Sequence, residues 1–268
     1  MKKVFQYKNK QLAYFVYGDG TPVILLHGFA ETNTVWKNQA DSLPGSFKLI
    51  IPDIPGSGES ALFDAGNEHL TMPELAESIN AILINEKIEH CVLLGHSMGG
   101  YITLSFAEKY PEKLKAFGLV NSTTFADNGE KKQNRLRGIE MMQSYGGHAF
   151  IKTITPNLFS GGFKEKNQWA VDELVEEGKK FKTENLQEYY YAMMNREDKT
   201  EVLKKSTVPV LFVIGAEDVA APLKDLLKQV HLPEVSYIHI IEDTGHMSML
   251  EKPEKLNRIL KQFVNEIE

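Results

Sequence analysis

The sequence predicts an α/β protein built on a mostly parallel, eight-stranded sheet with helices on both faces. The first observation is a set of short, continuous apolar runs, such as residues 23–26 and 92–94, which are typical of strands buried on both sides. The second is a helical spacing of apolar residues between these runs, as in residues 73–87. Because strands and helices alternate along the chain, most of the strands are expected to run parallel.

The N-terminal segment predicts a hairpin, because residues 3–7 and 11–17 alternate apolar and polar side chains around Lys8-Asn9-Lys10. The other six strands are expected at residues 23–26, 47–51, 92–94, 116–120, 208–214 and 235–241. Helices are expected in four places: from Trp36 to Leu43, at residues 73–87, from Gly99 to Tyr110 and at residues 253–267. Thr71 is the expected N-cap of the second of these helices.

Residues 125–206 differ in character from the rest of the chain, because they lack short buried runs and carry long, charged helical patterns. A segment of this length is too long for a connecting loop. We therefore expect a helical cap over one edge of the sheet, inserted into a core formed by residues 1–124 and 207–268. No Pro-, Gly- or Ser-rich linker brackets the segment, which argues against a separately tethered domain.

The composition is that of a globular protein without a nucleic-acid or membrane partner. Of the 268 residues, 42% are hydrophobic and 25% are charged, and the formal charge is −6 with no cluster of Lys or Arg. The N-terminus lacks the apolar stretch of a signal peptide, and no run approaches the ~18 apolar residues of a membrane span. The single cysteine, Cys91, is expected to be a buried, inert thiol. We expect a cytoplasmic monomer or homodimer that acts on a small-molecule substrate with no cofactor or metal ion.

The segment Gly95-His96-Ser97-Met98-Gly99 has the spacing of a nucleophile elbow, in which a strand turns abruptly into a helix. The middle residue of such a turn has a strained backbone, and the flanking glycines remove side chains that would collide. The Ser97 hydroxyl is expected at the helix N-terminus, where backbone N–H groups can stabilise an anion. A chance loop is the alternative, and the strand before the motif and the helix after it argue against that alternative.

A serine nucleophile needs a base and an acid, and in an open parallel sheet such groups gather beyond the carboxyl ends of strands. His246 is the only histidine after the last predicted strand, and Gly245 is expected to permit an unusual backbone angle there. Asp218 follows the preceding strand, so its carboxylate is expected beside the His246 loop. A surface loop histidine is the alternative interpretation of His246.

Together these residues resemble the α/β-hydrolase fold superfamily, and most closely its capped serine-hydrolase, carboxylesterase-like branch. The matching motifs occur in the family's order and cover the chain from about residue 20 to the C-terminus: His27-Gly28-Phe29, Asp53-x-Pro55-Gly56-x-Gly58-x-Ser60, Gly95-His96-Ser97-Met98-Gly99-Gly100, Gly215-x-Glu217-Asp218-x-x-x-Pro222 and Gly245-His246. Some relatives place the acid after the strand that here ends at Asn121, and this chain has none there, which favours Asp218. Dehalogenases and epoxide hydrolases carry an aspartate at the position of Ser97, which argues against both chemistries.

The resemblance implies an oxyanion hole formed by the backbone N–H groups of Met98 and Phe29. Fixed donors of this kind stabilise the negative oxygen of a tetrahedral intermediate. His27 is expected to bond within its own loop, His96 to support packing or the turn, and Asp53 to tie the loop after its strand.

Large apolar residues of the predicted cap are candidates for a pocket above Ser97, although most are expected to hold the cap helices together. The candidates for substrate contact, besides Phe29 and Met98, are Met141, Tyr145, Trp169, Tyr190 and Met194. The cap's arginines are expected to be solvated at the surface, with receipt of a substrate carboxylate as the alternative: Arg135, Arg137 and Arg196.

The residues predict a serine hydrolase that cleaves carboxylic ester, lactone or thioester bonds of a small, partly apolar substrate through an acyl-enzyme. Its nucleophile, base and acid are expected to be Ser97, His246 and Asp218. A C–C bond hydrolase or a perhydrolase-type enzyme uses the same three residues, and the sequence does not separate these activities. A small-molecule receptor on the same fold is the non-enzymatic alternative, and the three filled catalytic positions argue for an enzyme.

Overall fold

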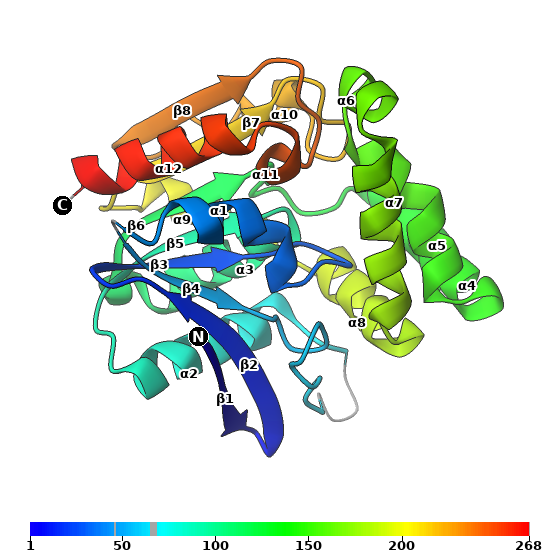
Figure 1. The fold of residues 1–268 in the computed structure, drawn as a ribbon, viewed down its shortest axis with the longest axis horizontal. Coiled ribbons are helices and arrows are strands. Elements are labelled where there is room, and N and C mark those ends of the chain that lie inside the picture. The colour runs from blue at the N-terminus through cyan, green and yellow to red at the C-terminus, as the bar shows by residue number, and fades with distance from the viewer. Residues whose placement is uncertain (46, 65–68, 268) are drawn as a thin grey trace.

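Eight strands form one sheet in the order β1-β2-β4-β3-β5-β6-β7-β8, in a computed structural model that describes residues 1–45, 47–64 and 69–267 (Figure 1). The strands are β1 (Lys2–Tyr7), β2 (Lys10–Tyr17), β3 (Thr21–Leu26), β4 (Phe47–Pro52), β5 (Cys91–His96), β6 (Leu114–Val120), β7 (Val210–Gly215) and β8 (Ser236–Ile241). β2 pairs antiparallel with both β1 and β4, and the remaining pairs are parallel. The predicted sheet is therefore confirmed, including the hairpin, whose turn residues Lys8 and Asn9 have φ of 47° and 59°.

The helices are α1 (Lys37–Ser42), α2 (Met72–Glu86), α3 (Met98–Lys109), α4 (Gly129–Tyr145), α5 (Gly147–Ile154), α6 (Gly161–Lys166), α7 (Gln168–Glu177), α8 (Thr183–Met194), α9 (Thr200–Lys204), α10 (Leu223–Leu226), α11 (Ser248–Glu251) and α12 (Pro253–Glu266). Short 3-10 turns lie at η1 (Asn33–Trp36), η2 (Pro111–Lys113), η3 (Thr155–Leu158) and η4 (Gly178–Lys180). Thr71 caps α2 as predicted, in a reciprocal capping box with Glu74. Within the described residues, no helix combines the length and the apolarity needed to cross a membrane.

Alternate side chains of the buried strands enter two hydrophobic layers, one on each face of the sheet. In β3, Ile24 and Leu26 pack in the layer that α2 and α3 cover, whereas Val23 and Leu25 pack in the layer that α1 and α12 cover. Since both faces are covered, every position of such a strand needs an apolar side chain, which explains the continuous runs. Cys91 lies in this core, and its burial raises the pKa of the thiol to about 12, as expected for an unreactive cysteine.

Helices α4–α8, which we call the cap, lie together beyond the carboxyl ends of the parallel strands (Figure 1). A backbone hydrogen bond of 2.8 Å from the Lys199 N–H to the Thr124 carbonyl joins the two ends of this insertion. α9 was predicted to belong to the cap, but it packs on α3, and Leu203 is fully buried in the core. The insertion therefore ends near residue 199, where the chain returns to the core before β7 begins.

Candidate functional site

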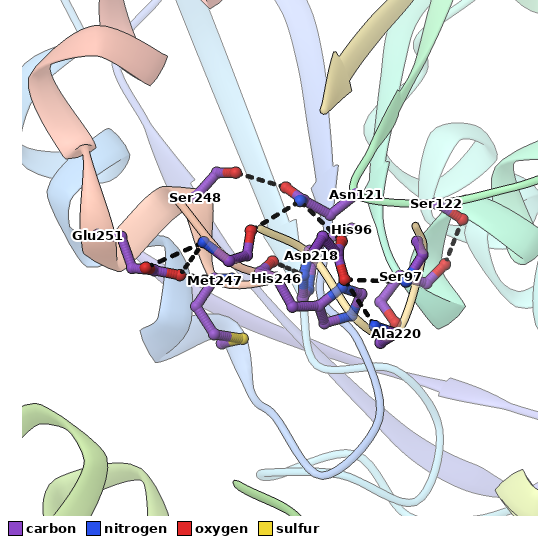
Figure 2. Close-up of polar contacts among 12 residues, drawn as sticks. His96, Ser97, Asn121, Ser122, Asp218, Ala220, His246, Met247, Ser248 and Glu251 are labelled. Atoms are coloured by element: carbon purple, nitrogen blue, oxygen red, sulfur yellow. Dashed lines mark hydrogen bonds and ion pairs between the residues drawn. The ribbon is translucent and has the colours of Figure 1, made fainter. Parts of the chain in front are cut away.

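Five loops meet at the edge of the sheet that faces the cap, where β3, β5, β6, β7 and β8 end. They carry, in chain order, Phe29, Ser97, Asn121, Asp218 and His246. Figure 2 shows the last four of these residues in one group, although they come from four different strands. Among the described residues, no group of three or more His, Cys, Asp or Glu side chains is arranged to hold a metal ion.

The turn at Ser97 has the strained geometry of an elbow between β5 and α3. Ser97 has φ of 49° and ψ of −116°, a conformation that L-residues rarely adopt. A Cβ on Gly95 would lie 2.2 Å from the Gly99 carbonyl oxygen, and a Cβ on Gly99 would lie 2.6 Å from the His27 carbonyl oxygen. The predicted reason for the two glycines is confirmed, because the chain is too close at both positions for a side chain.

The imidazole of His246 is paired with the Asp218 carboxylate. Its Nδ1 lies 2.8 Å from Asp218 Oδ2. The other carboxylate oxygen, Oδ1, accepts the backbone N–H groups of Ala220 and Ala221, both at 2.8 Å. Because a carboxylate only accepts, Nδ1 carries the proton and Nε2 keeps a free lone pair when the ring is neutral. The structure thus brings together the base and the acid that were predicted from the sequence.

The charges of this pair stabilise each other. Burial disfavours the protonated ring, but the neighbouring Asp218 carboxylate outweighs this effect and raises the pKa of His246 above its ordinary value of 6.5. Burial also disfavours the ionised carboxylate, but the ring and hydrogen bonds from Ala221 and Asn121 lower the pKa of Asp218 below its ordinary value of 3.8. Asp218 is therefore ionised at neutral pH, and His246 accepts a proton more readily than a free histidine does.

Asn121 connects Asp218 to the loop that carries His246. Its Nδ2 donates to Asp218 Oδ2 at 2.9 Å and to the Gly245 carbonyl oxygen at 3.1 Å. Its Oδ1 accepts the Ser248 hydroxyl, so the Asn121 amide is hydrogen-bonded at both ends. In the sequence, Asn121 stood out only because some relatives carry an acid at this strand end and this chain does not. A polar residue directly after a buried strand was the signal that could have found it.

Glu251 is a buried carboxylate that fixes the backbone around His246. Its oxygens accept the N–H of Gly245 at 3.0 Å and the N–H of Met247 at 3.2 Å, which are the two neighbours of His246. It also accepts the N–H of Ser160, at 3.0 Å, from the segment between η3 and α6. Glu251 is not among the residues predicted from the sequence, because an acid in a helix near the C-terminus looks like an ordinary surface residue.

A further buried carboxylate, Glu31, connects the loop of Phe29 through His96 to the backbone of His246. It accepts the Gly28 N–H at 2.6 Å and lies 3.1 Å from Nδ1 of His96. The other ring nitrogen of His96 lies 2.9 Å from the His246 carbonyl oxygen. Burial disfavours ionised Glu31, but the His96 ring outweighs this and lowers the pKa of Glu31. His96 therefore supports the site, as predicted, whereas Glu31 was missed.

Gly245 is required for packing and not for the unusual backbone angle that we predicted. It is not among the glycines with positive φ, so that part of the prediction is wrong. A Cβ there would lie 2.6 Å from the Ser160 nitrogen and 2.7 Å from the Leu158 carbonyl oxygen. The N–H of His246 donates to the same Leu158 oxygen at 2.7 Å. The segment that contains η3 thus lies directly against the loop of the base.

His27 and Asp53 shape loops, as predicted. Nδ1 of His27 donates to the carbonyl oxygen of the next residue at 2.8 Å, and Nε2 accepts the N–H of Ile54 at 3.0 Å. Burial lowers the pKa of His27, which is consistent with a neutral ring. Asp53 accepts the N–H of Asn33 and the N–H of Glu59, both at 2.9 Å. Both side chains are occupied in holding backbone and are not available for proton transfer.

The two backbone groups predicted for an oxyanion hole are available as donors. Met98 is the first residue of α3, and the first N–H groups of a helix have no acceptor inside it. Among the described residues, the N–H of Phe29 has no acceptor either. The ring of Phe29 points toward the cap, where its centroid lies 4.7 Å from that of Tyr190. Two other candidates for substrate contact are partly buried. Met141 packs against the apolar cluster that Phe29 and Tyr190 also contact, and Met194 lies at the end of α8.

The exposure of five side chains in the inserted segment tests what was predicted for each of them. Tyr145 and Trp169 were predicted as candidates, but they are 74% and 65% exposed, which does not fit the lining of a pocket. Their helical patterns indicated apolar residues without indicating which side of the helix is covered.

The three arginines of this segment differ in exposure. Arg137 is exposed as predicted. The expectation of surface solvation is wrong for Arg135 and Arg196, whose side chains are 17% and 5% exposed.

Three comparisons relate this geometry to known proteins. The model of a family described as alpha/beta hydrolase fold matches residues 21–253. A dihydrolipoyllysine-residue acetyltransferase component of an acetoin cleaving system from Pseudomonas putida is 27% identical, over 96% of this chain and 67% of its own. Protein ABHD8 of Mus musculus is 26% identical over 90% of this chain, which spans about half of that relative, 54%. The structure of a thermophilic esterase from Thermogutta terrifontis matches with a TM-score of 0.91 and 27% identity, over 96% of this chain and 94% of its own.

Proposed function

Since the chain belongs to the alpha/beta hydrolase family, we propose that it is a serine hydrolase that cleaves carboxylic ester, lactone or thioester bonds of a small, partly apolar substrate. In this proposal Ser97 is the nucleophile, His246 the general base and Asp218 the acid that orients the base. The observation that carries it is the 2.8 Å contact between His246 Nδ1 and Asp218 Oδ2, at the edge of the sheet where the strained turn of Ser97 also lies. The similarity to an esterase at 27% identity supports the type of bond.

The proposed reaction has two steps. In the first, Nε2 of His246 takes the proton of Ser97 Oγ while Oγ bonds to the substrate carbonyl carbon. The tetrahedral intermediate then collapses, and the departing alcohol or thiol takes the proton from Nε2. In the second step, water gives a proton to Nε2 and attacks the acyl carbon, the acid leaves, and the proton returns to Oγ. Asp218 remains ionised throughout and stabilises the imidazolium that forms twice in each cycle.

The negative oxygen of each tetrahedral intermediate is stabilised by the N–H groups of Met98 and Phe29 in this proposal. Donors that are fixed before the reaction need no reorganisation, and each contributes on the order of 10²–10³ in rate. Glu31 accepts the N–H of Gly28 and holds the backbone immediately before Phe29. The position of the second donor therefore depends on a buried carboxylate that is hydrogen-bonded to the backbone.

Activity is expected to rise with pH and to reach half of its maximum above pH 6.5. His246 must be neutral to take the proton from Ser97, and its pKa lies above the ordinary value of 6.5 because Asp218 stabilises the charged ring. Below that pKa the ring is protonated, so turnover falls as the pH falls. The measurement is kcat/KM for p-nitrophenyl acetate between roughly pH 5 and 9, corrected for spontaneous hydrolysis. A flat profile, or a midpoint below 6.5, would contradict the assignment of the base.

A fluorophosphonate probe tests the proposed function directly. We expect one probe per chain, attached to Ser97 and located by mass spectrometry of peptides, because only an activated serine attacks such a phosphorus centre. A panel of p-nitrophenyl esters, thioesters and lactones then defines the bond that is cleaved. Absence of labelling, together with binding of these compounds without turnover, would overturn the proposal and favour a small-molecule receptor.

A further inference from the structure

Two arginines at the start and the end of the cap share one buried carboxylate. Arg135 Nε donates to Asp127 Oδ2, and Arg196 Nη1 lies 2.8 Å from Asp127 Oδ1. The Asp127 side chain has no solvent exposure. Burial disfavours its ionised form, but the two guanidinium groups outweigh this and hold the pKa of Asp127 below its ordinary value of 3.8. Two cations and one anion leave this buried cluster with one unbalanced positive charge.

The hydrogen bonds of the two arginines show which of them is free to bind a ligand. Arg196 donates from Nη1 to the Met193 carbonyl oxygen at 2.7 Å and from Nη2 to the Phe125 carbonyl oxygen at 2.8 Å. Its guanidinium thus joins the end of α8 to the segment that enters the cap. Among the described residues, neither Nη group of Arg135 has an acceptor. The edge of the Arg135 guanidinium that is formed by Nη1 and Nη2 is therefore available to donate to a ligand.

Arg135 lies close to the proposed oxyanion hole. Its Cζ is 5.1 Å from the centroid of the Tyr190 ring, and the centroid of that ring is 4.7 Å from that of Phe29. The Tyr190 ring thus separates the guanidinium from the ring of Phe29, the residue whose N–H is the second proposed oxyanion donor. The partner cation, Arg196, lies 3.9 Å from the ring of Tyr101, one helical turn after Ser97. The charged cluster therefore contacts two aromatic side chains, one packed against Phe29 and one on the helix that begins after Ser97.

We propose that the natural substrate carries a carboxylate in addition to the bond that is cleaved, and that this carboxylate binds Arg135. The inference rests on the proposed function, because it names the substrate class of that site. A buried charge without a counter-ion is costly, and a guanidinium edge binds a carboxylate through two parallel hydrogen bonds. A substrate carboxylate supplies both the missing negative charge and the missing acceptors.

Matched ester pairs test this inference. In the first pair the charge is on the acyl side: mono-p-nitrophenyl glutarate and the corresponding glutaramide ester, which is neutral and of the same length. In the second pair it is on the leaving group: the butyrate esters of 4-hydroxybenzoate and 4-hydroxybenzamide. The readout is the ratio of kcat/KM within each pair, normalised to hydroxide hydrolysis. This ratio does not depend on the fraction of protein that is active.

We expect the carboxylate ester to be preferred in at least one pair, and Arg135→Gln to reduce that preference by about 10- to 100-fold, the usual contribution of hydrogen bonds to a charged group. Arg135→Lys should retain part of the preference, because it keeps the charge and loses the bidentate geometry. Arg137→Gln is the matched control, since Arg137 lies exposed on the same helix and should leave both ratios unchanged. Arg137→Gln should also hydrolyse the neutral esters at the parent's rate, since Arg137 is exposed and has no part in the cluster.

Equal ratios in the parent and in Arg135→Gln, for both pairs, would overturn the inference while leaving the proposed function intact. Calorimetric titration with glutarate separates the two proposals when no ester is cleaved. Binding to the parent that weakens about tenfold in Arg135→Gln supports the carboxylate site on its own. Equal binding to both proteins, or no binding to either, rejects that site regardless of the fate of the proposed function.

Discussion

Replacement of Ser97 by alanine is expected to lower turnover of a reactive ester by at least about 10⁴-fold, because the proposed mechanism forms its acyl-enzyme on the Ser97 hydroxyl. Loss of the nucleophile in a serine protease costs on the order of 10⁶ in kcat. Some acceleration over water should remain, since the backbone N–H groups proposed as oxyanion donors are unchanged. The measurement is single-turnover hydrolysis of p-nitrophenyl acetate at a pH one unit above the midpoint of the parent's profile.

Two controls show whether the loss comes from chemistry or from the fold. Ser105→Ala removes a hydroxyl from the same helix, α3, and should keep the parent's rate. Ser97→Ala should melt at the parent's temperature, because alanine meets the same strain at φ of 49°. Ser97→Gly should melt higher, since glycine adopts this backbone without the cost of about 1–3 kcal/mol that other residues incur. Parent-like hydrolysis by Ser97→Ala would refute the nucleophile.

Much of the fold could be predicted because its signals are local. Most parallel strands contain a short run of consecutive apolar residues, as β3 and β5 do, and the hairpin turn is a pair of residues that both adopt positive φ. The position of α9 was not predictable in this way. Its pattern has one deeply buried residue, Leu203, and such a pattern fits a helix on the cap as well as a helix on α3. The choice between them depends on the return of the chain at Lys199, which is set by a contact with Thr124.

In the candidate site too, residues within local motifs could be predicted from the sequence, and residues that depend on distant partners could not. Ser97 and His246 could be found because each follows a strand within a short motif. Glu31 and Glu251 could not, because their importance comes from partners that are distant in the chain. Glu251 accepts a hydrogen bond from Ser160, 91 residues earlier, and His96 reaches the carbonyl of His246 across 150 residues. An isolated acid in a sequence shows none of these partners, and most acids are exposed.

Asp218→Asn is expected to lower kcat by about 10⁴-fold with the fold preserved, as the same exchange does in a serine protease triad. The structure gives a specific reason. Oδ1 of Asp218 accepts two backbone N–H groups at 2.8 Å, from Ala220 and Ala221, so the oxygen of an asparagine must stay there. The amide NH₂ then takes the place of Oδ2 and donates to Nδ1 of His246, which must accept. The ring proton moves to Nε2, and a protonated Nε2 cannot take the proton of Ser97.

The amide orientation also has a structural consequence that can be measured. The new NH₂ would face Nδ2 of Asn121, which in the parent donates to Asp218 Oδ2 at 2.9 Å. Two donors that face each other in a buried site destabilise the protein by about 1–3 kcal/mol. The double variant with Asn121→Asp supplies an acceptor for this NH₂ but turns the same oxygen toward the Gly245 carbonyl, so it should recover only part of this stability. Asp225→Asn, on the exposed face of α10, is the matched control and should leave kcat unchanged.

The pH profile separates loss of orientation from a general loss of structure. In the parent, burial acts to lower the pKa of His246, and the Asp218 carboxylate acts to raise it and dominates. Asp218→Asn removes the largest contribution that raises the pKa, and burial then opposes only the smaller contributions of Glu31 and Glu251, so the midpoint of the residual activity should move to lower pH. Partial unfolding would reduce the amplitude of the profile without moving its midpoint. A reduced amplitude at the parent's midpoint would therefore contradict the role of Asp218 as the partner that sets the charge and tautomer of the base.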